Sequence, residues 1–493
     1  MQYDLAVIGT GPAGQKAAIN AAKLGKSVAV IERVGGTGGV CVNTGTIPSK
    51  AMREAILHLT GRRQRHFYGA GYAVKERITM ADLHNRTQQV IHSEIDMIHA
   101  QMARNGVMLR QGEASFVEPH CLRVCRGDHS EELLARHVLI AVGSRPARPD
   151  NVPFVPGRVI DSDQILQLTE LPRSLIVVGG GVIGTEYACM FAAVGVSTTL
   201  VDKGSRILGF ADAEIAESLQ YQMRDMNVRL RLGEEVASVQ VDERGVAVTL
   251  KSNTVLRAET VLFASGRQGN TDTLNLAAAG LAADERGRLR VNEHFQTEVP
   301  HIYAAGDVVG FPALAATSME QGRLATCHMF GRAWDTTQPL FPFGIYTIPE
   351  ISMIGPGEAE LVRSGVPYEV GIARYREIAR GQLMGDLGGL LKLIFHAESR
   401  RILSVHIIGD GATELIHIGQ TAMAAALPID YFVSTVFNYP TLAECYRVAA
   451  LDGMNRCRAG GRCDVSECCE SAEPRADNGV DSPDGRTKAR PIT

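Results

Sequence analysis

The 493-residue sequence has no long apolar run, and no stretch approaches the ~20 residues that a membrane-spanning helix requires. It is not strongly charged in either sense, with 50 basic against 54 acidic residues and a formal net charge of −4. This balance gives no reason to expect a nucleic acid or an anionic membrane as a partner. The first residues, Met1 to Asp4, lack a basic segment leading into an apolar one, so no secretory signal is expected. We therefore predict a cytoplasmic protein.

Cysteine and histidine form no ligand pattern. The 10 cysteines and 14 histidines are not spaced as in a metal site, so no metal ligand is predicted. Four of the cysteines, Cys457, Cys463, Cys468 and Cys469, lie in a C-terminal segment rich in Gly, Pro, Ser, Asp and Arg. Such a segment cannot bury enough apolar surface to become ordered. We predict that residues 457–493 form a disordered tail.

A glycine-rich turn follows an apolar run close to the N-terminus. The run at 3–8 leads into the sequence GTGPAG, with Gly9, Gly11 and Gly14, and then into a helical pattern of small residues. In this arrangement the first glycine makes a tight turn, the second admits a pyrophosphate to the backbone, and the third lets the helix pack on the strand. Glu32, at the end of the next apolar run, is placed to accept hydrogen bonds from an adenosine ribose. The segment therefore predicts a dinucleotide site.

The same arrangement returns about 170 residues later, which implies a second dinucleotide-binding domain. An apolar run at 174–178 precedes the turn GGGVIG at 179–184, and Asp202 ends the following run. An acid there favours NAD, because a carboxylate repels a 2′-phosphate, whereas Lys203 and Arg206 could pair with that phosphate. The mixed signature predicts an enzyme that admits both coenzymes. The alternative is that the two basic residues are only solvated surface charges.

The segment 38–50, GGVCVNTGTIPSK, resembles the redox-active segment of the pyridine nucleotide-disulfide oxidoreductases, such as dihydrolipoamide dehydrogenase. In that family a Gly-Gly-x-Cys-x-x-x-x-Cys-x-Pro-Ser-Lys stretch places a disulfide against the flavin. Here Cys41 matches the first cysteine, and Thr46 stands in place of the second. Because a threonine cannot form a disulfide, the resemblance implies that no relay runs from the flavin to a dithiol.

The C-terminal part also lacks a residue that the disulfide reductases of the family need. They carry a His-Pro-Thr-x-x-Glu stretch, whose histidine protonates the dithiol of the partner subunit, whereas this chain has Tyr439-Pro440-Thr441 and then Glu444. A tyrosine, with a free pKa near ~10, is a poor proton shuttle at neutral pH. Intact dinucleotide signatures without the disulfide machinery resemble the soluble pyridine nucleotide transhydrogenases of that family, over about residues 3–456. The acid at position 202 departs from them, since a neutral residue is expected there.

This resemblance implies an NAD(P)(+) transhydrogenase of the Si-specific type, with tightly but non-covalently bound FAD and with NAD and NADP as substrates. Hydride would pass from NADPH to the flavin and, after exchange of the coenzyme, to NAD, in a ping-pong cycle without a redox-active disulfide. Two alternatives stay open: an NAD(P)H diaphorase or quinone reductase, and a non-catalytic redox sensor. The resemblance also implies a homodimer or larger homo-oligomer, in which Glu444 serves the site of the partner chain.

The resemblance assigns roles to single residues. Lys50 and Glu186 match the ion pair beside the flavin N5, and Asp307 matches the acid that binds the ribityl chain. Cys41 is expected near a helix N-terminus, which would lower its pKa and let it contact the flavin or be oxidised; alternatively it is a small packing residue.

The catalytic candidates are Lys50, Glu186, Cys41, Tyr439 and Glu444. The predicted FAD-binding residues are Gly9, Gly11, Pro12, Gly14, Glu32, Arg33, Gly38, Gly39, Val40, Cys41, Thr46, Lys50, Gly143, Gly306 and Asp307. The predicted NAD(P)-binding residues are Gly179, Gly181, Val182, Ile183, Gly184, Glu186, Asp202, Lys203, Arg206 and Gly266.

The predicted fold is α/β, with two Rossmann-like dinucleotide-binding domains and a C-terminal α+β dimerisation domain. The FAD-binding domain is expected to be discontinuous, over residues 1–150 and 271–335, with the NAD(P)-binding domain inserted at 151–270. Residues 336–456 are expected to form the interface domain.

Overall fold

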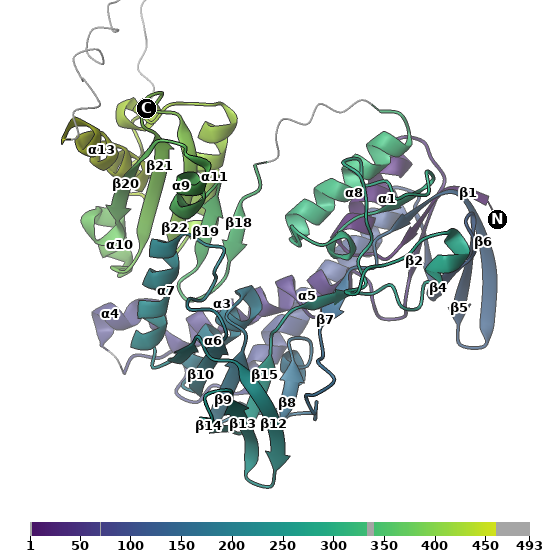
Figure 1. Cartoon of the computed structure of the whole chain (residues 1–493), viewed down its shortest axis with the longest axis horizontal. Helices are drawn as coiled ribbons and strands as arrows, with labels where there is room; N and C mark the ends of the chain where they lie inside the picture. The colour runs from purple at the N-terminus through teal and green to yellow at the C-terminus, as the bar shows by residue number, and fades with distance from the viewer. Residues whose placement is uncertain (1, 70, 333–339, 460–493) are drawn as a thin grey trace, which may run out of the picture.

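The computed structural model describes residues 2–69, 71–332 and 340–459. Its three larger sheets, two largely parallel and one antiparallel, lie in separate parts of the molecule (Figure 1). The first sheet lies near the N-terminus, the second at the bottom of the view, and the third beside the C-terminal helix α13. This arrangement confirms the predicted α/β class.

The first sheet has a parallel core because its strands are joined by helices that cross its faces. Its order is β3-β2-β1-β6, and β17 pairs with the far half of β6. The members of this core are β1 (Gln2–Ile8), β2 (Val28–Glu32), β3 (Met108–Gln111), β6 (His129–Ile140) and β17 (Ile302–Ala304). An antiparallel extension of β4 (Glu113–Glu118) and β5 (Cys121–Arg126) pairs with the near half of β6.

Helices cover the first sheet, and two of them cross closely because their contact is lined by small residues. They are α1 (Pro12–Lys23) and α8 (Ala315–Met329), and the long helix α5 (Met80–Arg104) packs nearby. A Cβ placed on Gly322 of α8 would lie 2.1 Å from the Ala13 carbonyl oxygen of α1. Only glycine at that position allows this approach.

The second sheet is parallel throughout, in the order β11-β10-β9-β15-β8. Its strands are β8 (Val159–Asp161), β9 (Ser174–Val178), β10 (Ser197–Asp202), β11 (Arg229–Leu232) and β15 (Thr260–Phe263). Helices α6 (Val182–Ala193) and α7 (Ala213–Asp225) belong to the same part, as does a small antiparallel sheet of β12 (Val236–Asp242), β13 (Gly245–Leu250) and β14 (Val255–Ala258). A two-stranded ribbon of β7 (Ser144–Pro146) and β16 (Arg267–Gly269) forms where the chain leaves the first sheet and returns to it.

The third sheet is antiparallel, in the order β18-β19-β22-β21-β20. Its strands are β18 (Phe343–Ile345), β19 (Ile351–Ile354), β20 (Tyr368–Arg374), β21 (Leu390–His396) and β22 (Ile402–Ile408). Its helices are α9 (Glu358–Ser364), α10 (Ala379–Met384), α11 (Ala412–Ala424), α12 (Asp430–Ser434) and α13 (Glu444–Ala459).

The last helix corrects the predicted start of the tail. Helix α13 continues to Ala459, and Cys457 is fully buried in the core of the third part. The reason is helical spacing, since Tyr446, Ala450, Met454 and Cys457 repeat on one buried face. The rest of the predicted tail, 460–493, which includes Cys463, Cys468 and Cys469, lies outside the described residues.

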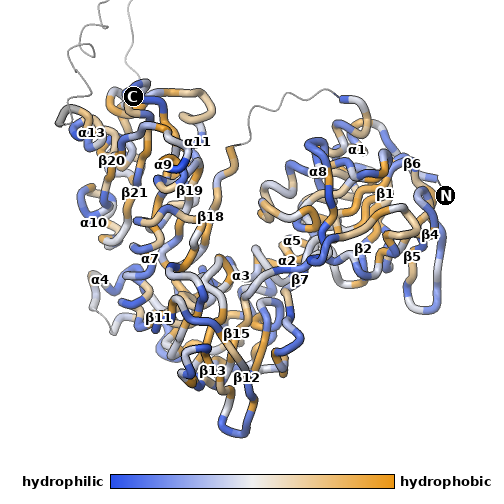
Figure 2. The backbone as a smooth tube through the Cα atoms, in the orientation of Figure 1, coloured by the Kyte–Doolittle hydropathy of each residue, from blue (hydrophilic) through white to orange (hydrophobic). Residues whose placement is uncertain are grey.

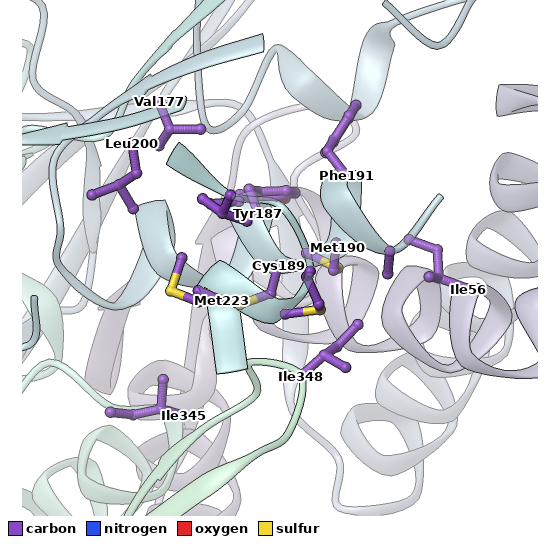
Figure 3. Close-up of a cluster of buried hydrophobic side chains, with 14 of the residues drawn as sticks. Ile56, Val177, Tyr187, Cys189, Met190, Phe191, Leu200, Met223, Ile345 and Ile348 are labelled. Carbon is purple, nitrogen blue, oxygen red and sulfur yellow. The ribbon is translucent and has the colours of Figure 1, made fainter. Parts of the chain in front are cut away.

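One hydrophobic cluster joins elements from all three parts (Figure 3). Its members include Ile56 of helix α3 (Thr46–Thr60), Tyr187 and Phe191 of α6, and Ile345 of β18. Figure 2 shows the apolar residues gathered in the strands, with hydrophilic residues at the hairpin tips. Within the described ranges, no helix combines the length and the apolar character needed to cross a membrane.

Candidate active site

The first glycine-rich turn has the geometry that its spacing predicts. Gly9 has φ +106°, and a Cβ on Gly14 would lie 2.0 Å from the Gly9 carbonyl oxygen. No protein atom lies within 4 Å of a Cβ built on Gly11, so the space beside this residue is open. Helix α1 begins immediately afterwards at Pro12, and its free N–H groups and positive dipole end suit a phosphate.

A first pocket opens at this turn. Twelve of the predicted FAD-binding residues line it: Gly9, Gly11, Pro12, Glu32, Arg33, Gly39, Val40, Cys41, Thr46, Gly143, Gly306 and Asp307. Three do not: Gly14 packs against Gly9, Gly38 donates its N–H to Thr10 Oγ1, and Lys50 lines a second pocket.

Sequence reasoning missed other lining residues, such as Ala114, Ser144 and Asn270. Only Ser144 had a local signal, because it belongs to the glycine-containing turn that follows β6.

The acid at the end of β2 is held by the protein itself. Glu32 Oε2 accepts hydrogen bonds from Thr10 N at 2.7 Å and from Thr10 Oγ1 at 2.6 Å, and Oε1 accepts one from Arg33 N at 3.0 Å. Burial raises the pKa of Glu32, while the hydrogen bonds from Thr10 oppose the rise. A carboxylate has further lone pairs, so it can still accept a ribose hydroxyl.

At the opposite wall, Asp307 is oriented by a chain of hydrogen bonds. Ser144 Oγ donates to Asp307 Oδ2 at 2.7 Å, and Arg267 Nε donates to Ser144 Oγ at 2.8 Å. Gly306 N donates to Gln321 Oε1 at 2.8 Å, which ties the turn to helix α8.

The second glycine-rich turn repeats the backbone geometry of the first. Gly179 has φ +115°, a Cβ on Gly184 would lie 1.9 Å from the Gly179 carbonyl oxygen, and the space at Gly181 is open. Asp202 accepts a hydrogen bond from Gly180 N on Oδ2 and one from Gly204 N on Oδ1, each at 2.6 Å. The carboxylate therefore closes the loop onto the turn.

The two basic residues beyond Asp202 have different surroundings. Lys203 is exposed, whereas Arg206 is half-buried and donates from Nη2 to Gly209 O at 3.5 Å. The buried Arg206 Nε has no hydrogen-bond partner among the described residues. Arg206 therefore has one donor that no described residue satisfies.

A second pocket contains the predicted ion pair. Lys50 Nζ lies 2.7 Å from Glu186 Oε2, and Tyr346 N donates to Glu186 Oε1 at 2.8 Å. The Lys50 ammonium also lies 4.9 Å from the centre of the Tyr346 ring, a cation–π contact that sequence reasoning missed. Val182 and Ile183 line this pocket as well. The remaining predicted NAD(P)-binding residues do not line it: Gly179, Gly181, Gly184, Asp202, Lys203, Arg206 and Gly266.

The two pockets meet at a common wall, to which both Val40 and Thr46 contribute. Cys41 lies in the short helix α2 (Gly39–Asn43) and lines the first pocket only. The expected lowering of its pKa is wrong: burial raises the pKa of the Cys41 thiol, and a hydrogen bond with Thr46 only partly opposes this. The dipole of so short a helix does not compensate for the loss of hydration.

Family models match most of the chain. The model described as pyridine nucleotide-disulphide oxidoreductase matches residues 3–322, and that of the dimerisation domain of the same family matches residues 341–450. The chain belongs to this family. Members of the family bind FAD, and the first pocket fits it, with an open glycine turn, an acid at the strand end and a helix N-terminus. The chain is thus a flavin-dependent oxidoreductase.

Individual relatives of this oxidoreductase are close in sequence. It is 54% identical over 460 residues to a soluble pyridine nucleotide transhydrogenase of Mycobacterium tuberculosis, covering 93% of this chain and 98% of the relative. It is 45% identical to one from Colwellia psychrerythraea, covering 92% and 98%. The predicted resemblance to these transhydrogenases is confirmed.

Solved structures of the family share its fold. LpdA from Mycobacterium tuberculosis has a TM-score of 0.84 at 27% identity, covering 91% of this chain and 99% of that one. The HOCl-induced flavoprotein disulfide reductase RclA from Escherichia coli has a TM-score of 0.82 at 28% identity, covering 91% and 99%.

Two catalytic candidates of this family member lie away from both pockets. Tyr439 is 70% exposed, and Glu444 is the first residue of α13. Neither lines the pockets described above, and the buried Glu444 Oε2 has no hydrogen-bond partner among the described residues.

Proposed function

We propose that this oxidoreductase transfers hydride between NADPH and NAD through FAD, without a redox-active disulfide. The observation that carries the proposal is the common wall of the two pockets. Thr46 stands there where disulfide reductases of the family have their second cysteine, so the shared wall holds no disulfide that could take electrons from the flavin. The names of the close relatives point to the same activity.

Bound FAD would supply the centre that accepts hydride from one coenzyme and donates it to the next in a ping-pong cycle. Lys50 places a positive charge at the coenzyme pocket, and Glu186 fixes that charge. Tyr346 holds both partners, through its N–H to Glu186 and its ring to Lys50. A positive charge so placed favours the anionic reduced flavin.

The proton stoichiometry of the reaction agrees with the absence of the histidine that disulfide reductases use as an acid–base group. Conversion of NADPH and NAD to NADP and NADH moves one hydride and neither releases nor consumes a proton. A proton shuttle is therefore not required, and Tyr439 in place of histidine is no obstacle. Cys41, with its raised pKa, is mainly a neutral thiol that packs beside the flavin pocket.

Coenzyme choice is proposed to lie in the loop after β10. Asp202 would bind the ribose of NADH, while Lys203 and Arg206 would bind the 2′-phosphate of NADPH. Gly179, Gly181 and Gly184 would bring the pyrophosphate against the N-terminus of α6.

We also propose the domain division given above, with residues 1–150 and 271–335 holding FAD, 151–270 holding NAD(P), and an interface domain that begins at 336 and continues to the end of α13 at Ala459. The return of β17 to the first sheet supports it. The matched dimerisation domain supports a homo-oligomer, in which the exposed Tyr439 and the half-buried Glu444 would reach the partner chain's site. The proposed location is the cytoplasm.

Anaerobic rapid mixing tests the function. NADPH should bleach the flavin absorbance of the purified protein, and NAD should restore it within turnover time. Lys50→Met should slow the bleaching by about 10- to 100-fold, because it removes a charge-assisted contact of ~1.5–3 kcal/mol. Arg257→Met, which breaks an exposed ion pair with Asp242, is the control and should have no effect.

The competing activities give different results in the same apparatus. Reoxidation by a quinone but not by NAD would identify a diaphorase, and absence of reoxidation by any acceptor would identify a sensor. Efficient reduction of lipoamide or glutathione disulfide would contradict the assignment, since Thr46 leaves no dithiol.

A further inference from the structure

Lys392 is a lysine with only 1% of its side chain exposed. It lies in β21, and its ammonium is 2.9 Å from Asp212 Oδ1 and 3.2 Å from Glu214 Oε2, with Glu358 in direct contact as well. Lysine is almost never fully buried unless it is paired. Burial would lower the pKa of Lys392, but hydrogen bonds to Glu358 and Asp212 outweigh it and raise the pKa, so the group stays charged.

The carboxylates around Lys392 come from two parts of the molecule. Glu358 begins α9 beside the third sheet, and Tyr368 Oη donates to its second oxygen at 2.9 Å. Asp212 and Glu214 belong to the second part, where Asp212 caps helix α7 by accepting a hydrogen bond from Glu214 N at 3.1 Å. The ammonium therefore fixes the start of α7 to the antiparallel sheet.

The start of α7 is also the end of the loop 203–211, which carries Lys203 and Arg206. At its beginning, the loop is held by the bonds of Asp202 to Gly180 and Gly204. In its middle, Leu208 adopts φ +48° and donates its N–H to Gly180 O at 2.8 Å. The Lys392 contacts are the attachment at the other end.

The third sheet also meets the loop 203–211 through apolar side chains. The ring of Phe210 lies 5.3 Å from that of Phe343 in β18, and Phe343 lines the second pocket. Ile207 and Leu208 of the loop lie in the same hydrophobic cluster as Ile345 and Leu390 of the sheet. The loop 203–211 thus packs against the antiparallel sheet.

We propose that Lys392 is a positioning residue for coenzyme choice. Through Asp212 and Glu214 it fixes the loop 203–211 in the conformation that presents Lys203 and Arg206 to the 2′-phosphate of NADPH. NADH has no such phosphate, so its binding depends on this conformation much less. The inference rests on the proposed role of the loop in reading the coenzyme.

The test compares the full-length, FAD-loaded variants Lys392→Met, Lys392→Arg and Arg206→Ala in the anaerobic bleaching reaction with NADPH and with NADH. Lys392→Met should raise the Kd for NADPH about tenfold while the Kd for NADH changes less than about threefold, since a shift of ~1 Å in contacting groups has effects of this order. The bleaching rate at saturation should be unchanged. Lys392→Arg keeps the charge and should restore part of the NADPH affinity.

The possible outcomes distinguish failure of the Lys392 role from failure of the proposed role of the loop 203–211. If Arg206→Ala weakens NADPH selectively and Lys392→Met does not, the positioning role is overturned and the proposed function stands. If Lys392→Met weakens both coenzymes equally, or only lowers the melting temperature, Lys392 is structural and the proposal fails. If neither variant changes the ratio, the loop does not read the phosphate, although hydride transfer itself is untouched.

Removing a buried charge can prevent folding. Should Lys392→Met be insoluble, Glu214→Gln takes its place, because this carboxylate is 39% exposed and its loss leaves Asp212 and Glu358 in contact with the ammonium. It should move the NADPH-to-NADH ratio in the same direction by about threefold. An unchanged ratio in the soluble Glu214→Gln protein would overturn the proposal.

Discussion

The two glycine-rich turns have nearly the same backbone but differ in how their acids are held. In both, the first glycine has a positive φ and the last packs its Cα against the first. Glu32 is buried and is bound by both the N–H and the hydroxyl of Thr10. Asp202 is half-buried, bound only by backbone N–H groups, and followed by the exposed Lys203.

This difference agrees with the proposal that the first turn holds a resident cofactor and the second an exchanging substrate. The first turn is tied to the segment before α2, since Thr10 Oγ1 also accepts a hydrogen bond from Gly38 N. The second turn has Gly180 where the first has Thr10, and no side chain is available there for such a link. A turn held by this additional hydrogen bond suits FAD that stays bound, and a turn without it suits coenzymes that would leave in every cycle.

The largest effect is expected from the same substitution made in each turn. Gly14→Ala and Gly184→Ala would each push a Cβ to within about 2 Å of a backbone oxygen, an overpacking that costs at least ~1–3 kcal/mol. Gly14→Ala should lose FAD, measured as the ratio of flavin to protein absorbance. Gly184→Ala should keep its flavin but bind NADPH and NADH about tenfold more weakly.

The matched control is Gly71→Ala, where a Cβ meets no atom of the described residues within 4 Å. Loss of flavin from both turn variants would contradict the assignment of separate ligands to the two turns.

A smaller effect is expected when the charges of the second site are changed. Arg206→Ala should raise the Kd for NADPH about tenfold or more and leave that for NADH nearly unchanged, because a charge-assisted contact contributes ~1.5–3 kcal/mol. Asp202→Asn, which keeps one acceptor for the loop, should lower the Kd for NADPH and raise that for NADH. Equal effects of either variant on the two coenzymes would show that these residues do not read the 2′-phosphate.

The smallest effect should come from removing the hydroxyl that distinguishes the first turn. Thr10→Val leaves Gly38 N without an acceptor and Glu32 with one donor fewer, at a cost of ~1 kcal/mol. The melting temperature of the FAD-loaded protein should fall by about 2–4 °C, with NADPH bleaching rates unchanged. Thr421→Val, which removes an exposed hydroxyl bonded only to the His417 carbonyl within its own helix, should have no comparable effect. If the two variants melt alike, the Thr10 link does not contribute to the closure of the FAD site.

Much of the dinucleotide machinery could be predicted because its signals are local. The two βαβ units were predicted from apolar runs that alternate with glycine turns. The predicted segments lie within a few residues of the observed bounds of β1, α1 and β2, and of β9, α6 and β10. Of the third part, which holds β21, β22 and α11, the mixed α+β character was predicted. The extension of the first sheet by β4 and β5 was not, since strand pairing across a sheet leaves no short-range pattern.

The sequence by itself determined which chemistry is possible: two turns that admit a pyrophosphate, acids at the strand ends, and Thr46 in place of a cysteine. These are properties of single residues and of spacings below about 30 positions. Only the tertiary structure decided how the groups act on one another. It brought Tyr346 to Glu186 across 160 positions and Lys392 to Asp212 across 180, and it raised the pKa of Cys41 by burying it. Such contacts depend on how three sheets pack around one hydrophobic cluster, and burial and long-range pairing are set by that packing rather than by any local pattern.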